Sequence, residues 1–326
     1  MTTDDHYRAR TALDSAGAAF AALEVNVARV LRGKPEAIRF AISCLLAEGH
    51  LLIEDRPGTG KTSLAKAMAA SIGGSVRRVQ FTPDLLPTDI TGVSVFDPRT
   101  ASFSYREGPV FTNILVADEI NRASPKTQAA LLEVMEERQV TAEGLSRPVP
   151  RPFMVIATQN PLDFQGTYPL PEVQLDRFAM KLSLGYASRE VELDIMSGLV
   201  QSHAQPEVEV VLDQRSVVAL ISHLETVEVS TPVREYMADL VQATRVDADL
   251  RLGVSTRGTL TLLGIARAFA VGSGRDYVTP DDIKALAPSV WSHRMAVTAD
   301  AELEGITEQQ VLADILDRVP VPRERM

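Results

Sequence analysis

Short apolar runs alternate with helical patterns through the first half of the chain. The runs are rich in Val, Ile and Phe, residue types that favour strands. They lie at residues 50–54, 76–81, 113–117, 153–157 and 181–184. Helical patterns lie between several of them, notably from Pro125 to Glu137, and residues 12–47 predict two helices separated near Gly33. This alternation predicts an α/β fold with a mostly parallel sheet.

After about Gly185 the pattern changes to helices only. Cap residues mark several helix starts, because Ser and Thr side chains accept hydrogen bonds from free N–H groups and proline fits the first turn. These starts are Ser188, Thr231-Pro232, Ser255-Thr256, Thr279-Pro280 and Thr307-Glu308-Gln309-Gln310. At 326 residues the chain is long enough for two domains. We therefore expect an α/β domain over residues 1–187, N-terminal helices included, and a smaller all-helical domain over residues 188–326.

A glycine-rich segment follows the first apolar run and precedes a helical pattern. It reads Glu54-Asp55-Arg56-Pro57-Gly58-Thr59-Gly60-Lys61-Thr62. A strand, a glycine loop, Lys-Thr and a helix form the context of a phosphate-binding P-loop. The glycines let the backbone turn so that several N–H groups point at one anion, which the helix N-terminus also attracts. Lys61 is expected to reach the β- and γ-phosphates, and the hydroxyl of Thr62 to hold Mg²⁺.

The predicted nucleotide-binding residues are Pro57, Gly58, Thr59, Gly60, Lys61, Thr62 and Ser63. The loop departs from the general pattern at its first position, where Asp55 replaces glycine. The last four residues of the loop carry the phosphate chemistry, so we interpret the site as intact. The alternative is a plain surface turn before a helix, which Gly-Thr-Gly-Lys-Thr after a strand disfavours.

Two acids end the third apolar run, Asn113-Ile114-Leu115-Val116-Ala117-Asp118-Glu119. In a P-loop protein the first acid, Asp118, holds Mg²⁺ through its water shell, and Glu119 orients and deprotonates the attacking water. The alternative is a pair of ordinary turn residues. Adjacent Asp and Glu favour a hydrolase over a kinase, because the nucleophile of a kinase is a substrate hydroxyl rather than water.

The fourth apolar run ends in a polar amide and is stopped by proline, in Ala157-Thr158-Gln159-Asn160-Pro161. Asn160 is expected beside the γ-phosphate, where it helps to fix the water. An Asn-Pro pair alone is more often only a turn. Its position one strand after the two acids favours the catalytic interpretation.

Composition narrows the function classes. The chain has 33 Lys and Arg against 43 Asp and Glu, a net charge of −10, which argues against a general nucleic-acid binder.

The single cysteine, Cys44, is expected to be a buried structural thiol, and it permits no disulfide within the chain. A polar N-terminus and the absence of an apolar run of about 20 residues favour a cytoplasmic protein without membrane insertion. The five histidines are scattered, so Mg²⁺ arriving with nucleotide is the only metal expected.

Four segments together resemble the MoxR family of AAA+ ATPases and cover most of residues 50–185. They are Gln80-Phe81-Thr82-Pro83-Asp84-Leu85-Leu86-Pro87-Thr88-Asp89-Ile90, Ala117-Asp118-Glu119-Ile120-Asn121-Arg122-Ala123, Ala157-Thr158-Gln159-Asn160-Pro161 and Gly166-Thr167-Tyr168-Pro169-Leu170-Pro171-Glu172-Val173-Gln174-Leu175-Asp176-Arg177-Phe178. More weakly, Gly253-Val254-Ser255-Thr256-Arg257 resembles the lid of the same family. The resemblance implies a P-loop AAA+ core followed by a helical lid domain. It also implies Asp at the position of Asp55, which accounts for the departure in the loop.

The same resemblance implies ATP as the nucleotide, held between the α/β domain and the lid, and rings of six subunits. Arg177 matches the arginine finger, which enters the neighbouring subunit's site and stabilises charge on the γ-phosphate. The alternative for Arg177 is a salt bridge with Asp176 or a nearby acid. Arg257 matches the second sensor, where it touches the γ-phosphate and couples the lid angle to the nucleotide state. The alternative for Arg257 is a solvent-facing helix residue.

Residues 89–112 and 138–150 are predicted insertions, the second one a hairpin around Glu143-Gly144. By resemblance, such insertions engage a partner in the ring pore or on its face. The alternative is a pair of plain surface hairpins. The resemblance implies a chaperone-like ATPase that remodels or activates a protein client, commonly one with a von Willebrand factor A domain. Two rivals stay open: a nucleotide-gated assembly scaffold with little turnover, and a DNA-acting AAA+ motor or loader.

Overall fold

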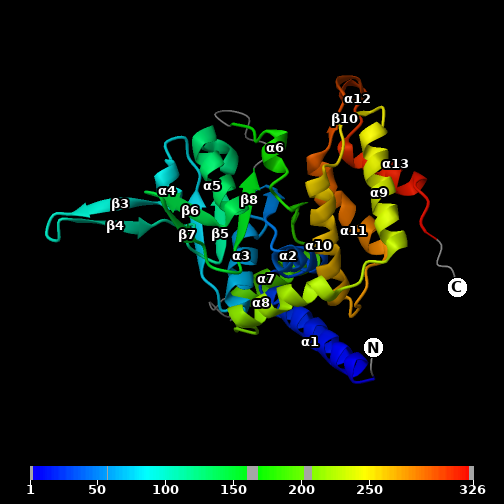
Figure 1. Cartoon of the computed structure of the whole chain (residues 1–326), viewed down its shortest axis with the longest axis horizontal. Coiled ribbons are helices and arrows are strands. Elements are labelled where there is room, and N and C mark those ends of the chain that lie inside the picture. Colours follow the sequence, from blue (N-terminus) through cyan, green and yellow to red (C-terminus); the bar gives the residue numbers. More distant parts are fainter. Residues whose placement is uncertain (1–2, 57, 160–167, 202–207, 323–326) are drawn as a thin grey trace.

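A five-stranded parallel sheet lies at the centre of the first half of the chain (Figure 1). The computed structural model describes residues 3–56, 58–159, 168–201 and 208–322. In spatial order the strands are β2 (Val76–Gln80), β5 (Ile114–Asp118), β8 (Met154–Gln159), β1 (Leu51–Glu54) and β9 (Met180–Leu182). All neighbouring strands of this sheet run parallel. The five apolar runs are therefore the five strands, and the predicted parallel sheet is confirmed.

Successive side chains of the three central strands, β1, β5 and β8, enter two hydrophobic clusters on opposite faces of the sheet. In β1, Leu51 and Ile53 join one cluster and Leu52 joins the other. In β5, Ile114 and Leu115 divide in the same way. Because both faces are covered, these strands read as continuous apolar runs rather than as an alternation of apolar and polar residues.

Helices cover both faces of the sheet. The cluster that contains Leu51 includes side chains of α1 (Thr3–Ala28), α2 (Pro35–Leu46) and α3 (Lys61–Ser71). The other cluster includes side chains of α4 (Pro87–Thr91) and α5 (Pro125–Glu137). Two shorter elements lie between sheet strands. The 3₁₀ turn Ile120–Arg122 follows β5, and α6 (Glu172–Leu175) precedes β9. The two predicted N-terminal helices are α1 and α2. Cys44 of α2 is buried, as expected, and burial raises the pKa of its thiol to about 12.

Both predicted insertions contain a two-stranded antiparallel hairpin. In the first, β3 (Gly92–Asp97) pairs with β4 (Ser102–Glu107), and in the second, β6 (Gln139–Ala142) pairs with β7 (Leu145–Pro148). The β3–β4 hairpin extends away from the rest of the molecule (Figure 1). Its tip is therefore free to contact another molecule without moving the sheet.

The second half of the chain, which the sequence predicts to be the lid, is made mainly of helices. They are α7 (Arg189–Gln201), α8 (Gln214–His223), α9 (Thr231–Val246), α10 (Thr256–Gly272), α11 (Pro280–Trp291), α12 (Ala299–Leu303) and α13 (Glu308–Arg318), with 3₁₀ turns at Leu224–Thr226 and Ser292–Arg294. The expectation of helices only needs a correction, because β10 (Leu250–Leu252) pairs antiparallel with β11 (Ala296–Val297). Strands of two and three residues are too short to give a periodic pattern. The cap of α9 is Ser230 rather than Thr231, whereas the predicted caps of α10, α11 and α13 are confirmed.

The lid packs against the α/β part through a shared hydrophobic cluster. Side chains of α8, α9, α10 and α11 join the cluster that covers one face of the sheet. The approach of α10 to α1 is close: a Cβ on Gly272 would lie 2.6 Å from the ring of Phe20. A single cluster leaves no gap in the core to mark a boundary, so the division at residues 187 and 188 stays a prediction. Among the described residues, no helix has the length and apolar character that crossing a bilayer requires.

Candidate active site

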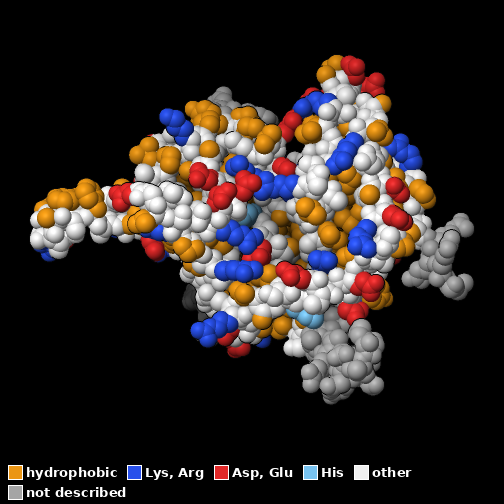
Figure 2. Space-filling view, viewed as in Figure 1, with side chains coloured by type: hydrophobic (Ala, Val, Ile, Leu, Met, Phe, Trp, Pro, Cys, Tyr) orange, Lys and Arg blue, Asp and Glu red, His pale blue; other side chains and the backbone are white. Residues whose placement is uncertain are grey.

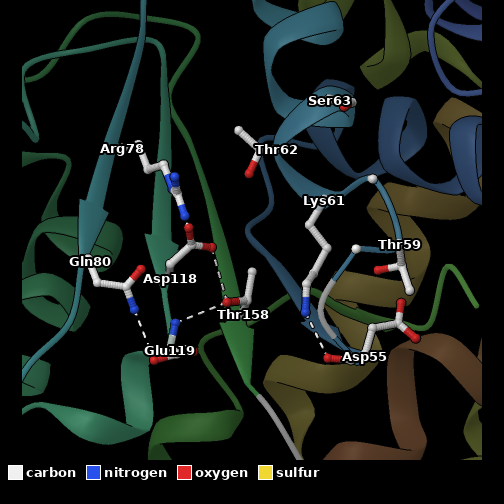
Figure 3. Close-up of a pocket in the computed structure, with 12 residues that line it drawn as sticks. Asp55, Thr59, Lys61, Thr62, Ser63, Arg78, Gln80, Asp118, Glu119 and Thr158 are labelled. Atoms are coloured by element: carbon white, nitrogen blue, oxygen red, sulfur yellow. Dashed lines mark hydrogen bonds and ion pairs between the residues drawn. The ribbon is translucent and has the colours of Figure 1, made fainter. Parts of the chain in front are cut away.

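A cavity of about 380 Å³ lies over the glycine loop, at the carboxyl ends of the sheet strands (Figure 3). Its lining residues are Asp55, Gly58, Thr59, Gly60, Lys61, Thr62, Ser63, Arg78, Gln80, Asp118, Glu119 and Thr158. The structure therefore brings the predicted loop residues together with both predicted acids. Pro57 and Asn160, which the sequence also assigns to this site, lie outside the described residues.

Two glycines shape the loop. Gly58 and Gly60 have φ angles of 85° and 96°, in the left-handed region that favours residues without a Cβ. Gly60 is the N-cap of α3, and Lys61 is the first residue of that helix. The loop thus delivers the free N–H groups of a helix start to the cavity, which is the geometry that binds phosphate.

Lys61 lies within this cavity and is held by the loop itself. Its Nζ donates a hydrogen bond to the backbone carbonyl of Asp55 at 2.7 Å. Burial lowers the pKa of the Lys61 ammonium, while the carboxylates of Asp55, Asp118 and Glu119 oppose this shift. The ammonium group therefore lies beside the place where a phosphate would bind.

Asp55, the unusual first residue of the loop, ties the loop to the segment that leads into the lid. Its carboxylate accepts hydrogen bonds from Ser183 Oγ at 2.8 Å, from the backbone N–H of Leu184 at 2.5 Å and from that of Gly185 at 3.3 Å. A glycine at position 55 would leave these donors without their acceptor. The departure from the general motif therefore has a structural function that the sequence did not reveal.

Asp118 is held from two sides. Its Oδ2 accepts a hydrogen bond from Arg78 Nε at 2.5 Å, and its Oδ1 accepts one from Thr158 Oγ1 at 3.2 Å. Only a tenth of the side chain is exposed. The hydroxyl of Thr62 points into the space between Asp118 and Lys61 (Figure 3). Mg²⁺ prefers such hard oxygen ligands, so these residues fit the predicted metal.

Glu119 has a strained backbone. Its φ and ψ are 54° and 51°, a left-handed conformation that costs a residue with a Cβ about 1–3 kcal/mol and is frequent at functional sites. Its N–H donates to Thr158 Oγ1 at 3.0 Å, and its Oε2 accepts from Gln80 at 2.9 Å and from Arg122 at 2.7 Å. The turn after β5 thus aims the carboxylate at the cavity.

Arg78, Gln80 and Thr158 also line this cavity, although no sequence motif indicated a role for them. Gln80 ends β2 and Thr158 lies near the end of β8, the two strands beside β5. Polar side chains at the carboxyl ends of strands adjacent to Asp118 were the available signal for Gln80 and Thr158. Arg78 lies two residues earlier and reaches Asp118 through the length of its side chain.

The two predicted arginines lie away from this cavity. Both contact one carboxylate on α5: Arg177 Nε lies 3.1 Å from Glu136 Oε2, and a terminal nitrogen of Arg257 lies 3.2 Å from Glu136 Oε1. They line a second cavity of about 210 Å³ between α5, the segment before β9 and α10. Within the single chain, Arg177 thus pairs with a nearby acid, but not with Asp176.

Asp176 fixes the two arginine-bearing segments to each other. Its carboxylate accepts hydrogen bonds from Arg294 at 2.7 Å and from Ser255, the N-cap of α10, at 3.2 Å. Arg257 follows this cap by two residues. In the single chain the lid places Arg257 beside Arg177 rather than in the P-loop cavity, and its contact with the γ-phosphate stays a prediction.

Comparisons with known proteins identify the family of the chain. The family model described as the ATPase family associated with various cellular activities matches residues 50–180, and the AAA lid domain model matches residues 242–315. Chaperone MoxR1 of Mycobacterium tuberculosis is 38% identical over 91% of this chain and 81% of its own length. The chain belongs to the MoxR family of AAA+ ATPases. Its fold, a P-loop α/β core followed by a helical lid, and its activity as an ATP hydrolase follow from this membership.

Other relatives match nearly the whole chain. The uncharacterized protein YeaC of Bacillus subtilis is 46% identical over 92% of this chain and 94% of its own length. Protein MoxR of Methylorubrum extorquens is 28% identical over 93% and 95%. The crystal structure of a candidate ATPase from Cytophaga hutchinsonii superposes with a TM-score of 0.91, at 34% identity, over 98% of this chain and 99% of that one. The MoxR resemblance of the sequence motifs is thus confirmed at the level of the family.

Proposed function

We propose that this MoxR-family ATPase hydrolyses ATP at the interfaces of a homo-oligomeric ring and uses the reaction to remodel or activate a partner protein. The observation that carries the proposal is the separation of the site into two parts. The P-loop cavity holds Lys61, Asp118 and Glu119, whereas Arg177 and Arg257 lie together on Glu136 outside that cavity. A second copy of the chain would supply the missing arginines.

Within one subunit, the P-loop residues would bind the phosphates of ATP. The N–H groups of the loop and the ammonium of Lys61 would hold the β- and γ-phosphates. Thr62 and Asp118 would hold Mg²⁺, which supplies positive charge to the phosphates when it is bound. Glu119 would take the proton of the attacking water, and Asn160 would help to place that water.

Arg177 and Arg257 would act together on the neighbour's γ-phosphate. The guanidinium groups contact the two oxygens of one carboxylate, and Asp176 links their backbones through Ser255 and Arg294. In the isolated chain the carboxylate of Glu136 occupies the position between them. A phosphate offers the same oxygen chemistry with more charge, so a bound nucleotide would compete with Glu136 for both arginines. A hexameric ring is the assembly that the family resemblance favours.

Turnover per subunit should rise with protein concentration and reach a plateau, because the site is complete only where two subunits meet. The test is steady-state ATP hydrolysis over a dilution series, with the oligomeric state measured in the same buffer by light scattering. A turnover per subunit that stays constant down to concentrations at which the protein is monomeric contradicts catalysis at subunit interfaces.

The β3–β4 hairpin is the proposed contact with the partner protein. Its exposed apolar side chains are Val93, Val95, Phe96 and Phe103, and Phe103 is 68% exposed. The rings of Phe96 and Phe103 lie 5.1 Å apart on the same face of the hairpin. Hydrophobic side chains gather on this projecting hairpin (Figure 2). Exposed apolar clusters of this kind mark surfaces that bind other proteins. The chaperone name of a relative favours a client protein, and the family resemblance favours one with a von Willebrand factor A domain.

Replacing both rings, Phe96→Ser with Phe103→Ser, should remove the response of turnover to such a partner and leave turnover without partner within about twofold. The rings lie far from the P-loop cavity, so the chemistry is not touched, whereas the loss of apolar contact area weakens binding. The measurement is ATP hydrolysis during titration with a purified von Willebrand factor A domain protein. An unchanged response contradicts the hairpin as the contact. The matched control is Ser94→Ala with Ser104→Ala on the same hairpin.

A further inference from the structure

Arg78 is a basic residue inside the P-loop cavity that the assignment of the site leaves unexplained. It lies on β2, the edge strand beside β5, and its guanidinium points at Asp118 (Figure 3). Among the described residues, Lys61 and Arg78 are the two cationic side chains that line this cavity. Lys61 has a defined partner in the backbone of the loop. Arg78 instead contacts the carboxylate that the metal requires.

The Arg78–Asp118 pair is asymmetric. Asp118 is a tenth exposed and is also held by Thr158, whereas the side chain of Arg78 is 59% exposed. The carboxylate is therefore fixed, while the guanidinium is able to move into solvent or into the cavity. Ion pairs with one largely exposed partner contribute little net stability, so this contact opens at small cost.

Charge explains why an arginine is needed there before ligand binds. Asp118 and Glu119 are neighbours in sequence and both face the cavity. The carboxylate of Glu119 pairs with Arg122. The ammonium of Lys61 contacts the carbonyl of Asp55 rather than either acid, so the guanidinium of Arg78 is the cation that lies against Asp118. Two adjacent carboxylates in a partly buried site repel each other unless a cation lies beside them.

The pair is not required to join the two strands. Five backbone positions of β2, from Val76 to Gln80, already pair with β5 in parallel register. Removing the side chain of Arg78 leaves that ladder intact. A role in the site rather than in the sheet is therefore the better explanation for its contact with Asp118.

We propose that Arg78 is the resident counter-ion of the metal position: it neutralises Asp118 in the free protein and swings from Asp118 to the phosphates when nucleotide binds. This inference rests on the proposed nucleotide site. It implies that Arg78 competes with Mg²⁺ for Asp118 and that it supports nucleotide binding most strongly when Mg²⁺ is absent. Arg78 is thus assigned as a phosphate-binding residue outside the P-loop.

The test compares Arg78→Gln with Arg77→Gln. Arg77 directly precedes Arg78 on the same strand, and its side chain points to the opposite face, so the control removes the same charge without reaching the cavity. The measurement is the affinity for N-methylanthraniloyl-ATP by fluorescence, once in EDTA and once in saturating Mg²⁺. Circular dichroism and thermal unfolding establish that each variant is folded.

Arg78→Gln should weaken binding in EDTA about tenfold relative to Arg77→Gln, the loss expected for a charge-assisted hydrogen bond. In saturating Mg²⁺ the loss of nucleotide affinity should be clearly smaller. The Mg²⁺ concentration that gives half of the increase in affinity should fall, because Arg78 no longer competes with Mg²⁺ for Asp118. Arg78→Lys, which keeps a cation, should recover most of the affinity in EDTA.

Three results overturn the inference. The first is a nucleotide affinity of Arg78→Gln that equals that of Arg77→Gln in both buffers. The second is a loss of affinity of the same size in both buffers, and the third is a loss that occurs only in Mg²⁺. A wild-type protein that binds no nucleotide in either buffer contradicts the proposed nucleotide site itself, which separates failure of the proposed function from failure of the role of Arg78.

Discussion

Glu119→Gln is expected to lower ATP turnover by about 100-fold or more while ATP remains bound, because general-base catalysis contributes factors of about 10²–10⁴. The phosphate-binding groups, Lys61 and the loop N–H groups, are untouched by this change. The amide that replaces the carboxylate keeps an oxygen for the donors of Gln80 and Arg122, so the strained turn at position 119 retains its contacts. Steady-state hydrolysis and the affinity for N-methylanthraniloyl-ATP measure the two halves of the prediction.

The matched control is Glu235→Gln, the same chemical change on an exposed position of α9 in the lid. Its turnover should equal that of the wild type. If Glu119→Gln hydrolyses ATP as fast as the control, Glu119 is not the base. If it loses turnover and nucleotide affinity together, its main role is to shape the cavity rather than to activate water.

The sheet and the P-loop could be predicted from the sequence because local signals determine them. The central strands β1, β5 and β8 are buried on both faces and appear as unbroken apolar runs, whereas the edge strands β2 and β9 are only partly apolar but were located as well. The Gly58–Gly60 turn and Lys61 at the start of a helix follow from adjacent residues. Asp118 and Glu119 were found because a strand ends in two acids. In each case the signal lies within about ten residues of the chain.

The contacts that complete the site could not be predicted, because they join distant residues. Asp55 was noted only as a departure from a motif, and its partners in the segment 183–185 lie about 130 positions away. Arg78 reaches Asp118 across two strands that are 40 positions apart in sequence. The pattern of a single sequence does not show which side chains from distant positions contact each other.

The position of Arg257 shows the same limit for the lid. Its helix was predicted correctly from the cap at Ser255. The side of the α/β core on which that helix packs depends on the whole lid, through the hydrophobic cluster that it shares with the core and through the buried Arg294–Asp176 contact. Local pattern gives the helix, and tertiary packing decides which cavity it faces.

Arg177→Ala and Lys61→Ala should each be inactive alone and should partly recover turnover when mixed. An arginine finger contributes about 10³–10⁵ to turnover, and a P-loop without its lysine does not hold the phosphates. In a mixed ring, the Arg177→Ala subunit offers an intact cavity and the Lys61→Ala subunit offers an intact finger. Turnover of the mixture, compared with each variant alone at the same total concentration, is the measurement. The control for nonspecific damage is Arg138→Ala. It removes an arginine that pairs with Glu48 and lines the second cavity, as Arg177 does.

The same mixing experiment shows whether Arg257 acts on the nucleotide of its own subunit or on that of the neighbour. If Arg257 acts on the neighbour's nucleotide, as its contact with Glu136 favours, then Arg257→Ala should be rescued by Lys61→Ala but not by Arg177→Ala, because no subunit in the second mixture carries both arginines. If Arg257 acts on its own P-loop, the pattern reverses: Lys61→Ala gives no rescue, since each cavity lacks one of its own groups, and Arg177→Ala does. Absence of rescue in every mixture that forms rings contradicts the action of either arginine in a neighbouring subunit.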